Sequence, residues 1–253
     1  MIARKMSTQN LLQRQPRTPR ISAVLIASGL AYACLHAPAH AQPADGSKPP
    51  LEITNVSSVN ADVQFVRVTA EIHNRSDRWA CAPRMLLRLR DAQDQDLTVT
   101  SIASGGRPNE REEMAVASRQ WLPPGGMSPV EYVRDHKNIS GKAAKVAARA
   151  GARDCSGTPP DVKVEGFATE TTSKGWIKAS GSIVVGGGTC RAPAAVIAVY
   201  APDGTIHRVY TVNPVATSTV ASAGQRFDFT RTSIPVLSDA PTIKVWGDCS
   251  AYQ

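Results

Sequence analysis

The chain has 253 residues, of which 42% are hydrophobic and only 5% aromatic, and it carries 29 basic against 21 acidic side chains. Five of the basic residues and none of the acidic ones lie before residue 42, which leaves 24 basic against 21 acidic groups in the rest of the chain. This near balance excludes the strongly basic surface typical of nucleic-acid binding, so we expect no nucleic-acid partner. The low aromatic content, with 18 Gly and 18 Pro, is typical of a β-rich protein with many turns.

Residues 1–41 have the pattern of a secretory signal peptide. A basic segment ends at Arg20, and the apolar run over residues 21–33 that follows is shorter than the roughly 20 residues of a membrane span. Ala39-His40-Ala41 then places small residues at positions −3 and −1 of a cleavage site. We expect the mature protein to begin at Gln42, to have no transmembrane segment, and to be periplasmic or secreted. Met6 is an alternative start.

The first predicted strand of the mature chain shows a period of two. After a Pro-rich linker over residues 42–50, the run Val63–His73 places apolar side chains at residues 66, 68, 70 and 72. Polar side chains, including Arg67 and His73, occupy the alternate positions. This pattern predicts a strand with one buried face and one face in water.

The same plan of strands, turns and cysteines is found twice along the chain. Each copy has a strand, a loop to a cysteine with Ala-Pro close behind it, a second strand, a short turn and a further strand. Each copy then has a Gly-containing turn, another strand and a last strand that ends in Asp-Cys. In the first copy the segments are Val63–His73, Cys81–Pro83, Met85–Leu89, Asp91–Asp96, a strand from Leu97, Leu122–Gly126, Met127–Arg134 and Lys145–Cys155; in the second they are Trp176–Val185, Cys190–Pro193, Ala195–Tyr200, Ala201–Gly204, Thr205–Val212, Ala221–Gly224, Gln225–Arg231 and Ile243–Cys249.

The repeat predicts an all-β fold of two tandem immunoglobulin-like β-sandwich domains. We expect the first domain over residues 51–156, a Pro-rich linker over 157–160 and the second domain over 161–253. The segment Ile102–Ala117 is an extra polar stretch of the first copy. The Ala-rich composition around Lys142 also allows a short helix over Ser140–Val146.

Four cysteines follow the expected cleavage site, and an even number in an oxidising compartment favours two disulfides. Zinc sites need closely spaced pairs, whereas the shortest gap here is the 35 residues from Cys155 to Cys190. Counting alone leaves three pairings open. Since each copy of the repeat contains two cysteines, we predict the intradomain disulfides Cys81–Cys155 and Cys190–Cys249. Cys34 follows Ala31-Tyr-Ala33, which makes lipidation an alternative to cleavage.

Two hairpin segments suggest a family. Val199–Ile206 (VYAPDGTI) and Leu87–Asp96 (LRLRDAQDQD) are similar to the hairpin of FxLYD-type modules, and the order of strands resembles tandem immunoglobulin-like modules of exported bacterial proteins. The resemblance implies the sandwich fold and brings no functional residues with it.

Several residues have both a chemical and a structural interpretation. The acidic run at Asp91, Asp94 and Asp96 suggests either a calcium loop or a hairpin tip, and the equivalent turn in the second copy favours the hairpin tip. The histidines at positions 73, 136 and 207 share no metal or triad spacing, so we expect no metal and no cofactor. Trp246, three residues before Cys249, is expected to pack near its disulfide.

Candidate partner contacts lie in the loops of the first copy. Trp79 and Trp121 border loops, where large aromatic side chains often take part in recognition. The charged segment around residues 105–113 has no counterpart in the second copy, and it is either a recognition loop or a solvated excursion. Its candidate contact residues are Arg107, Glu110, Arg111 and Glu112.

No catalytic motif is present. The chain lacks a Gly-x-Ser-x-Gly elbow, and Gly186-Gly-Gly188 lacks the Lys-Ser/Thr of a phosphate loop. We expect a non-catalytic periplasmic binding or envelope-assembly protein whose partner is another envelope protein. A pilus-type periplasmic chaperone is an alternative, although the long exposed alternating strand that such proteins donate is not found before the linker. An enzyme with a site assembled from loops of both domains is the second alternative, because catalytic groups converge from distant segments.

Overall fold

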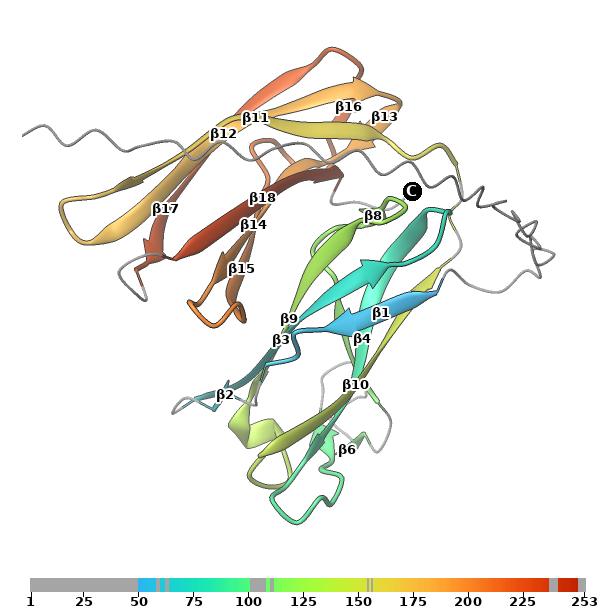
Figure 1. Cartoon of the computed structure of the whole chain (residues 1–253), viewed down its shortest axis with the longest axis vertical. Helices are drawn as coiled ribbons and strands as arrows, with labels where there is room; N and C mark the ends of the chain where they lie inside the picture. The colour runs from blue at the N-terminus through green and yellow to red at the C-terminus, as the bar shows by residue number, and fades with distance from the viewer. Residues whose placement is uncertain are drawn as a thin grey trace, which may run out of the picture. The chain divides into compact units, whose positions relative to one another are not determined.

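The computed structural model describes residues 50–57, 60–61, 64–100, 108–109, 112–153, 155, 157–236 and 241–249. Within these ranges the regular structure is β-strand apart from one 3-10 turn at His136–Asn138 (Figure 1), so the predicted all-β class is confirmed. The described residues contain no helix that is long and apolar enough to cross a membrane. The predicted signal peptide and nearly all of the linker over 42–50 lie outside these ranges. Residues Asp45–Gln253 form one compact unit.

The first half of this unit is a sandwich of two small antiparallel sheets. In one sheet, β3 (Phe65–Asn74) has β9 (Met127–Asp135) on one side and β1 (Leu51–Thr54) and β2 (Asn60–Ala61) on the other. In the second sheet, β4 (Ala80–Arg90) lies between β10 (Lys145–Arg153) and the short strands β7 (Glu113–Val116) and β8 (Trp121–Leu122).

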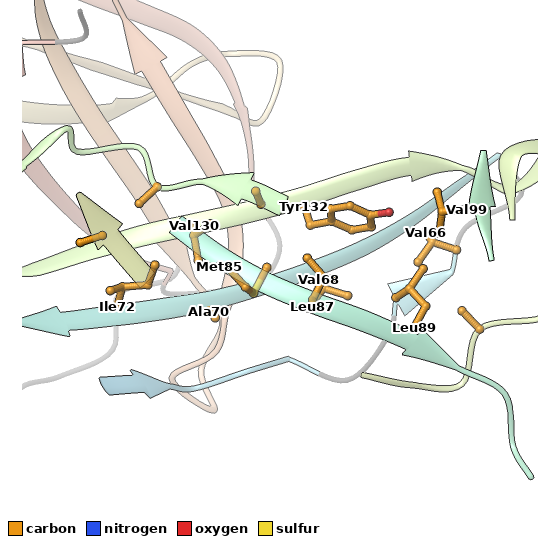
Figure 2. Packing of buried hydrophobic residues seen from close by; sticks show 14 of the residues in the cluster. Val66, Val68, Ala70, Ile72, Met85, Leu87, Leu89, Val99, Val130 and Tyr132 are labelled. Atoms are coloured by element: carbon orange, nitrogen blue, oxygen red, sulfur yellow. The ribbon is translucent and has the colours of Figure 1, made fainter. Parts of the chain in front are cut away.

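The core of this sandwich follows from the period of two in its central strands. The four apolar residues of β3 predicted to face inward are fully buried, and they meet alternate residues of β4 across the sandwich (Figure 2). Alternate side chains of a strand point to the same face, so one apolar residue in two is enough to build this layer. The labelled core residues of β3 and β4 are Val66, Val68, Ala70, Ile72, Met85, Leu87 and Leu89.

The second half repeats the same pairing scheme. Here β12 (Trp176–Gly187) lies between β11 (Asp161–Thr171) and β17 (Arg226–Pro235), and β14 (Pro193–Tyr200) lies between β15 (Ile206–Val212) and β18 (Thr242–Cys249). The short strands β13 (Thr189–Arg191) and β16 (Val220–Ser222) pair beside the second sheet, as the start of β4 pairs with β8 in the first sandwich.

Backbone details confirm the internal repeat. Ala82 and Ala192 each precede a proline, and both have a positive φ, of 44° and 52°. Their N–H groups donate to the carbonyls of Gln120 and Thr219, at 2.8 Å in both cases. The tips of the two hairpins are closed by equivalent bonds, from Asp91 N to Gln95 O and from Ala201 N to Thr205 O. The predicted disulfides Cys81–Cys155 and Cys190–Cys249 are both present.

The extra polar segment of the first copy, Ile102–Ala117, interrupts the strand that is equivalent to β15 (Ile206–Val212) of the second copy. In the second sandwich, β15 pairs with β14 without a break from Ala195 to Tyr200, apart from one register shift. In the first sandwich the strand that pairs with β4 at this position is divided into two segments. The first segment contains Leu97, whose N–H donates to the carbonyl of Leu89, and the second is β7, which pairs with β4 from Leu87 onward. Between them, β5 (Val99–Thr100) pairs with β6 (Pro108–Asn109). The end of the predicted polar stretch is therefore part of the sandwich, with Ala115 and Ala117 buried.

The short helix allowed over Ser140–Val146 is not formed. The 3-10 turn at His136–Asn138 comes earlier, and β10 begins at Lys145. Ala143 is buried in the core, and the N–H of Ala144 donates to the carbonyl of Arg90 in β4. Tertiary pairing with β4 overrides the helical propensity of the alanines here.

The middle of the outer face of β3 is buried, which corrects the prediction of a face in water; Arg67 and His73, at its two ends, are partly exposed. Thr69 is 1% exposed and Glu71 is 5% exposed. Thr69 Oγ1 donates to the carbonyl of Ile206 at 2.6 Å, and the Tyr200 hydroxyl donates to Glu71 Oε1 at 2.8 Å. The second sandwich covers this face, and its backbone and side chains satisfy the polar groups that would otherwise be solvated.

The opposing surface belongs to the sheet β15–β14–β18. Every residue of β14 is buried, both those that face the core of the second sandwich and those that face outward, such as Ala198 and Tyr200. Trp246 packs in this outer cluster, so the prediction that it lies beside Cys249 is wrong. The two residues are three positions apart on a strand, so their side chains point to opposite faces.

Tyr200→Phe is expected to destabilise the protein by about 1–3 kcal/mol, because Glu71 would lose a hydrogen bond in a buried site. Asn55 Nδ2, at 2.8 Å, and the His73 ring, at 3.1 Å, are the other partners of that carboxylate. Urea unfolding measures the difference. Tyr210→Phe is the matched control, since the Tyr210 ring stacks against Arg231 and no hydrogen bond to its hydroxyl is found among the described residues. Equal losses in the two variants would contradict the prediction.

Candidate functional site

A cleft of about 420 Å³ lies where the β8 region of the first sandwich meets the start of β11 and the end of β18. The linker contributes Pro159 and Pro160 to one wall. Since both sandwiches and the linker supply residues, the cleft exists only in the assembled unit. The described residues that line it are Trp79, Arg119, Trp121, Pro123, Pro159, Pro160, Asp161, Val162, Lys163, Gly247 and Asp248.

The two tryptophans predicted as contact residues both line this cleft. Trp121 pairs with Cys81 in the β4–β8 ladder and is 6% exposed, whereas Trp79 is half-buried. Both indoles pack in an apolar cluster that contains Cys81, Cys190 and Cys249, with Cys155 at its edge. The two disulfides therefore fix the base on which the aromatic wall is built.

Arg119 is the partly buried cation of the cleft. It sits between β7 and β8, where its N–H donates to Ser128 Oγ at 3.0 Å and its Nη1 donates to the carbonyl of Met127 at 2.8 Å. Its Nε atom is buried and has no hydrogen-bond partner. Burial lowers the pKa of this guanidinium, against the opposing charge of Asp248. Among the described residues, no carboxylate forms an ion pair or hydrogen bond with it.

Asp248 is the buried acid of the site. It is 3% exposed and accepts a hydrogen bond from the N–H of Gln120, which links β18 to the first sandwich. Burial raises the pKa of its carboxyl to about 7, although backbone N–H groups, beginning with that of Gln120, and the charge of Arg119 act in the opposite direction. At the rim, Lys163 and Asp161 are exposed and lie 3.5 Å apart.

The side chains that line the cleft are of the kinds that bind a ligand or a segment of a partner protein. The described lining residues provide indole and proline surface, one partly buried cation and one buried acid, and they include no Ser, Thr, Cys or His side chain. Concave sites of this kind, apolar with a few placed polar groups, bind ligands or segments of partners. Among the described residues, no cluster of three or more His, Cys, Asp and Glu side chains is arranged to hold a metal ion.

The other predicted contact residues are not brought to the cleft. Arg107, Glu110 and Arg111 lie outside the described residues. Glu112 is on the outer face of the sheet β10–β4–β7, where its Oε1 accepts a hydrogen bond from Arg149 Nε at 2.9 Å. The charge of Glu112 is thus already matched within the sandwich.

The acidic residues of the first hairpin form hydrogen bonds with arginine side chains of the same sheet and with the backbone of the turn. Asp96 accepts hydrogen bonds from Arg88 at 3.0 Å and Arg90 at 2.8 Å, and these bonds lower the pKa of its carboxyl. Asp91 Oδ1 accepts from the N–H groups of Gln93 and Gln95, both at 2.9 Å, which closes the turn. These contacts are those of a hairpin tip, the favoured interpretation of this segment.

Two residues of the cleft were missed from sequence. Arg119 is a lone basic residue between two short strands, and no local pattern distinguishes it from a surface arginine. Asp248 carried a weak signal, since it belongs to the Asp-Cys ending that the two copies share. Because a disulfide cysteine at the end of the last strand is usually buried, the acid next to it could have been predicted to be buried as well.

The sequence matches none of the protein-family models and none of the curated proteins with which it was compared. The resemblance of its hairpins to FxLYD-type modules therefore stays a prediction. The two disulfides are compatible with an extracytoplasmic protein.

Proposed function

We propose that this chain is an exported, non-catalytic binding protein of the bacterial envelope, and that it holds a segment of another envelope protein in the cleft between its sandwiches. The observation that carries the proposal is the cleft itself, whose walls come from both sandwiches and whose more accessible aromatic side chain is the half-buried Trp79. The sequence pattern of a signal peptide and the two disulfides support the location.

The buried joint supports a role in recognition. Glu131 of β9 accepts a hydrogen bond from Arg67 of its own sheet at 2.6 Å and one from the N–H of Val209 in the second sandwich at 3.0 Å, so one carboxylate links the two sandwiches. Such contacts have directional geometry and hold the two halves of the cleft at a fixed separation. A preformed site loses less entropy on binding than one that must be assembled.

Photo-crosslinking in intact cells tests the function. A photoreactive phenylalanine analogue replaces Trp79 in one variant and Trp176, which is 41% exposed on the second sandwich, in the matched control. We expect a protein adduct from position 79 and none from position 176. Recovery of monomer alone from position 79 would overturn the proposal, and so would equal adducts from both positions.

A further inference from the structure

Among the described residues, no carboxylate contacts the guanidinium of Arg119 directly. A guanidinium has five N–H donors, and the hydrogen bonds found for the side chain of Arg119 account for one donor group, Nη1. Its Nε is buried without a partner. Burial of this guanidinium is unfavourable, and an anion that enters the cleft would relieve part of the cost through its charge and through the Nη donors that form no hydrogen bond with described residues.

We propose that the junction cleft binds a carboxylate carried on an apolar group, with Arg119 as the anchor of the carboxylate and Trp79 and Trp121 as the surface for the apolar group. This inference rests on the proposed function and names the chemical group that the partner inserts. The carboxylate belongs either to a peptide or to a small carboxylic acid, and both present the same chemistry to Arg119.

The charge balance of the cleft favours a single negative charge. Arg119 is the one partly buried cation among the described lining residues, and Lys163 at the rim is matched by Asp161. Asp248 is an acid that already acts on Arg119 through its charge. A dianion such as phosphate would find one cation and a neighbouring acid, whereas a carboxylate matches the planar guanidinium fork with two parallel hydrogen bonds.

The walls of the cleft favour an apolar neighbour for that carboxylate. Trp79 and Trp121 present indole surface, and Pro123, Pro159 and Pro160 present rigid rings on backbone that cannot donate hydrogen bonds. Aromatic faces bind apolar groups with little loss of side-chain entropy, because an indole has only two rotatable bonds. A strongly hydrated polar ligand would lose its water here without replacement hydrogen bonds.

Calorimetric titration of the disulfide-bonded protein compares acids with their neutral amides. The probes are N-acetylphenylalanine and N-acetylphenylalanine amide, octanoate and octanamide, and inorganic phosphate. We expect each acid to bind at least about tenfold more tightly than its amide, the ratio that one charge-assisted hydrogen-bond pair supplies. A preference for N-acetylphenylalanine indicates a peptide source, and a preference for octanoate indicates a fatty acid. Equal affinities of acid and amide, or tighter binding of phosphate, would overturn the inference.

Two variants localise the binding. Arg119→Gln should abolish the preference for acid over amide, and Trp79→Ala should weaken both, whereas Trp176→Ala should change neither. If Arg119→Gln does not fold, the acid and amide comparison in the parent protein still decides. Crosslinked adducts at position 79 together with equal acid and amide affinities would reject the carboxylate and leave the proposed function standing. If there are no adducts at position 79 and no preference for acid over amide, both the carboxylate inference and the proposed function are rejected.

Discussion

Replacing both cysteines of the first disulfide, in the double variant Cys81→Ala/Cys155→Ala, is expected to lower the free energy of unfolding by about 4 kcal/mol. The cross-link closes a loop of 74 residues, and its loss releases the corresponding entropy to the unfolded chain. A loss of that size is a large share of the stability of an ordinary domain. The second disulfide closes 59 residues, so its removal in Cys190→Ala/Cys249→Ala is expected to have nearly the same effect.

Urea unfolding of the two variants, with and without reductant, measures this effect. Both disulfides lie in the apolar cluster under Trp121, so loss of either cross-link should also increase the solvent exposure of indoles at the cleft, which fluorescence reports. Reductant should lower the midpoint of the parent protein and lower that of each variant less. A variant that keeps the parent midpoint would contradict the entropic account of these cross-links.

Asp248→Asn is expected to leave stability nearly unchanged at pH 4 and below, and to raise it progressively above that, by up to about 4 kcal/mol at pH 8. Burial of Asp248 raises the pKa of its carboxyl from 3.8 to about 7 in the folded protein. Between these values the folded state retains a proton that the unfolded state has lost. Stability therefore falls as the pH rises through this window, and the loss is complete above the folded pKa.

Asparagine reproduces the protonated side chain, because its amide oxygen accepts from the Gln120 N–H as the carboxyl does. The quantity to measure is the difference in unfolding free energy between variant and parent at several pH values from 4 to 8. This difference removes the titration of the other acids, including Asp96, whose pKa is lowered. A difference that does not change with pH would show that Asp248 is ionised throughout.

Sequence patterns were sufficient for the central strands and for the pairing of the cysteines, but they did not indicate β1 or β11. The alternation in β3 predicted which four side chains enter the core, since the period of a strand fixes which residues share a face. The repeat selected Cys81–Cys155 and Cys190–Cys249 among three pairings, because two copies of one fold place equivalent residues at equivalent sites. Trp79 and Trp121 were also identified, although nothing local indicated that Arg119 and Asp248 would join them.

The sequence by itself determined the two sandwiches, and only the tertiary structure decided how their outer faces are used. A polar residue that alternates with apolar ones on a strand is predicted to be exposed to solvent. Thr69 and Glu71 are nevertheless buried, because groups on the second sandwich form hydrogen bonds with them. One signal of this was present in β14, where the run from Ala194 to Tyr200 is apolar at every position and so predicts burial on both faces. The sequence did not show that the first sandwich covers the outer face of β14, or that a cleft containing Arg119 forms between the two sandwiches. Both depend on contacts between residues more than a hundred positions apart, such as Gln120 and Asp248.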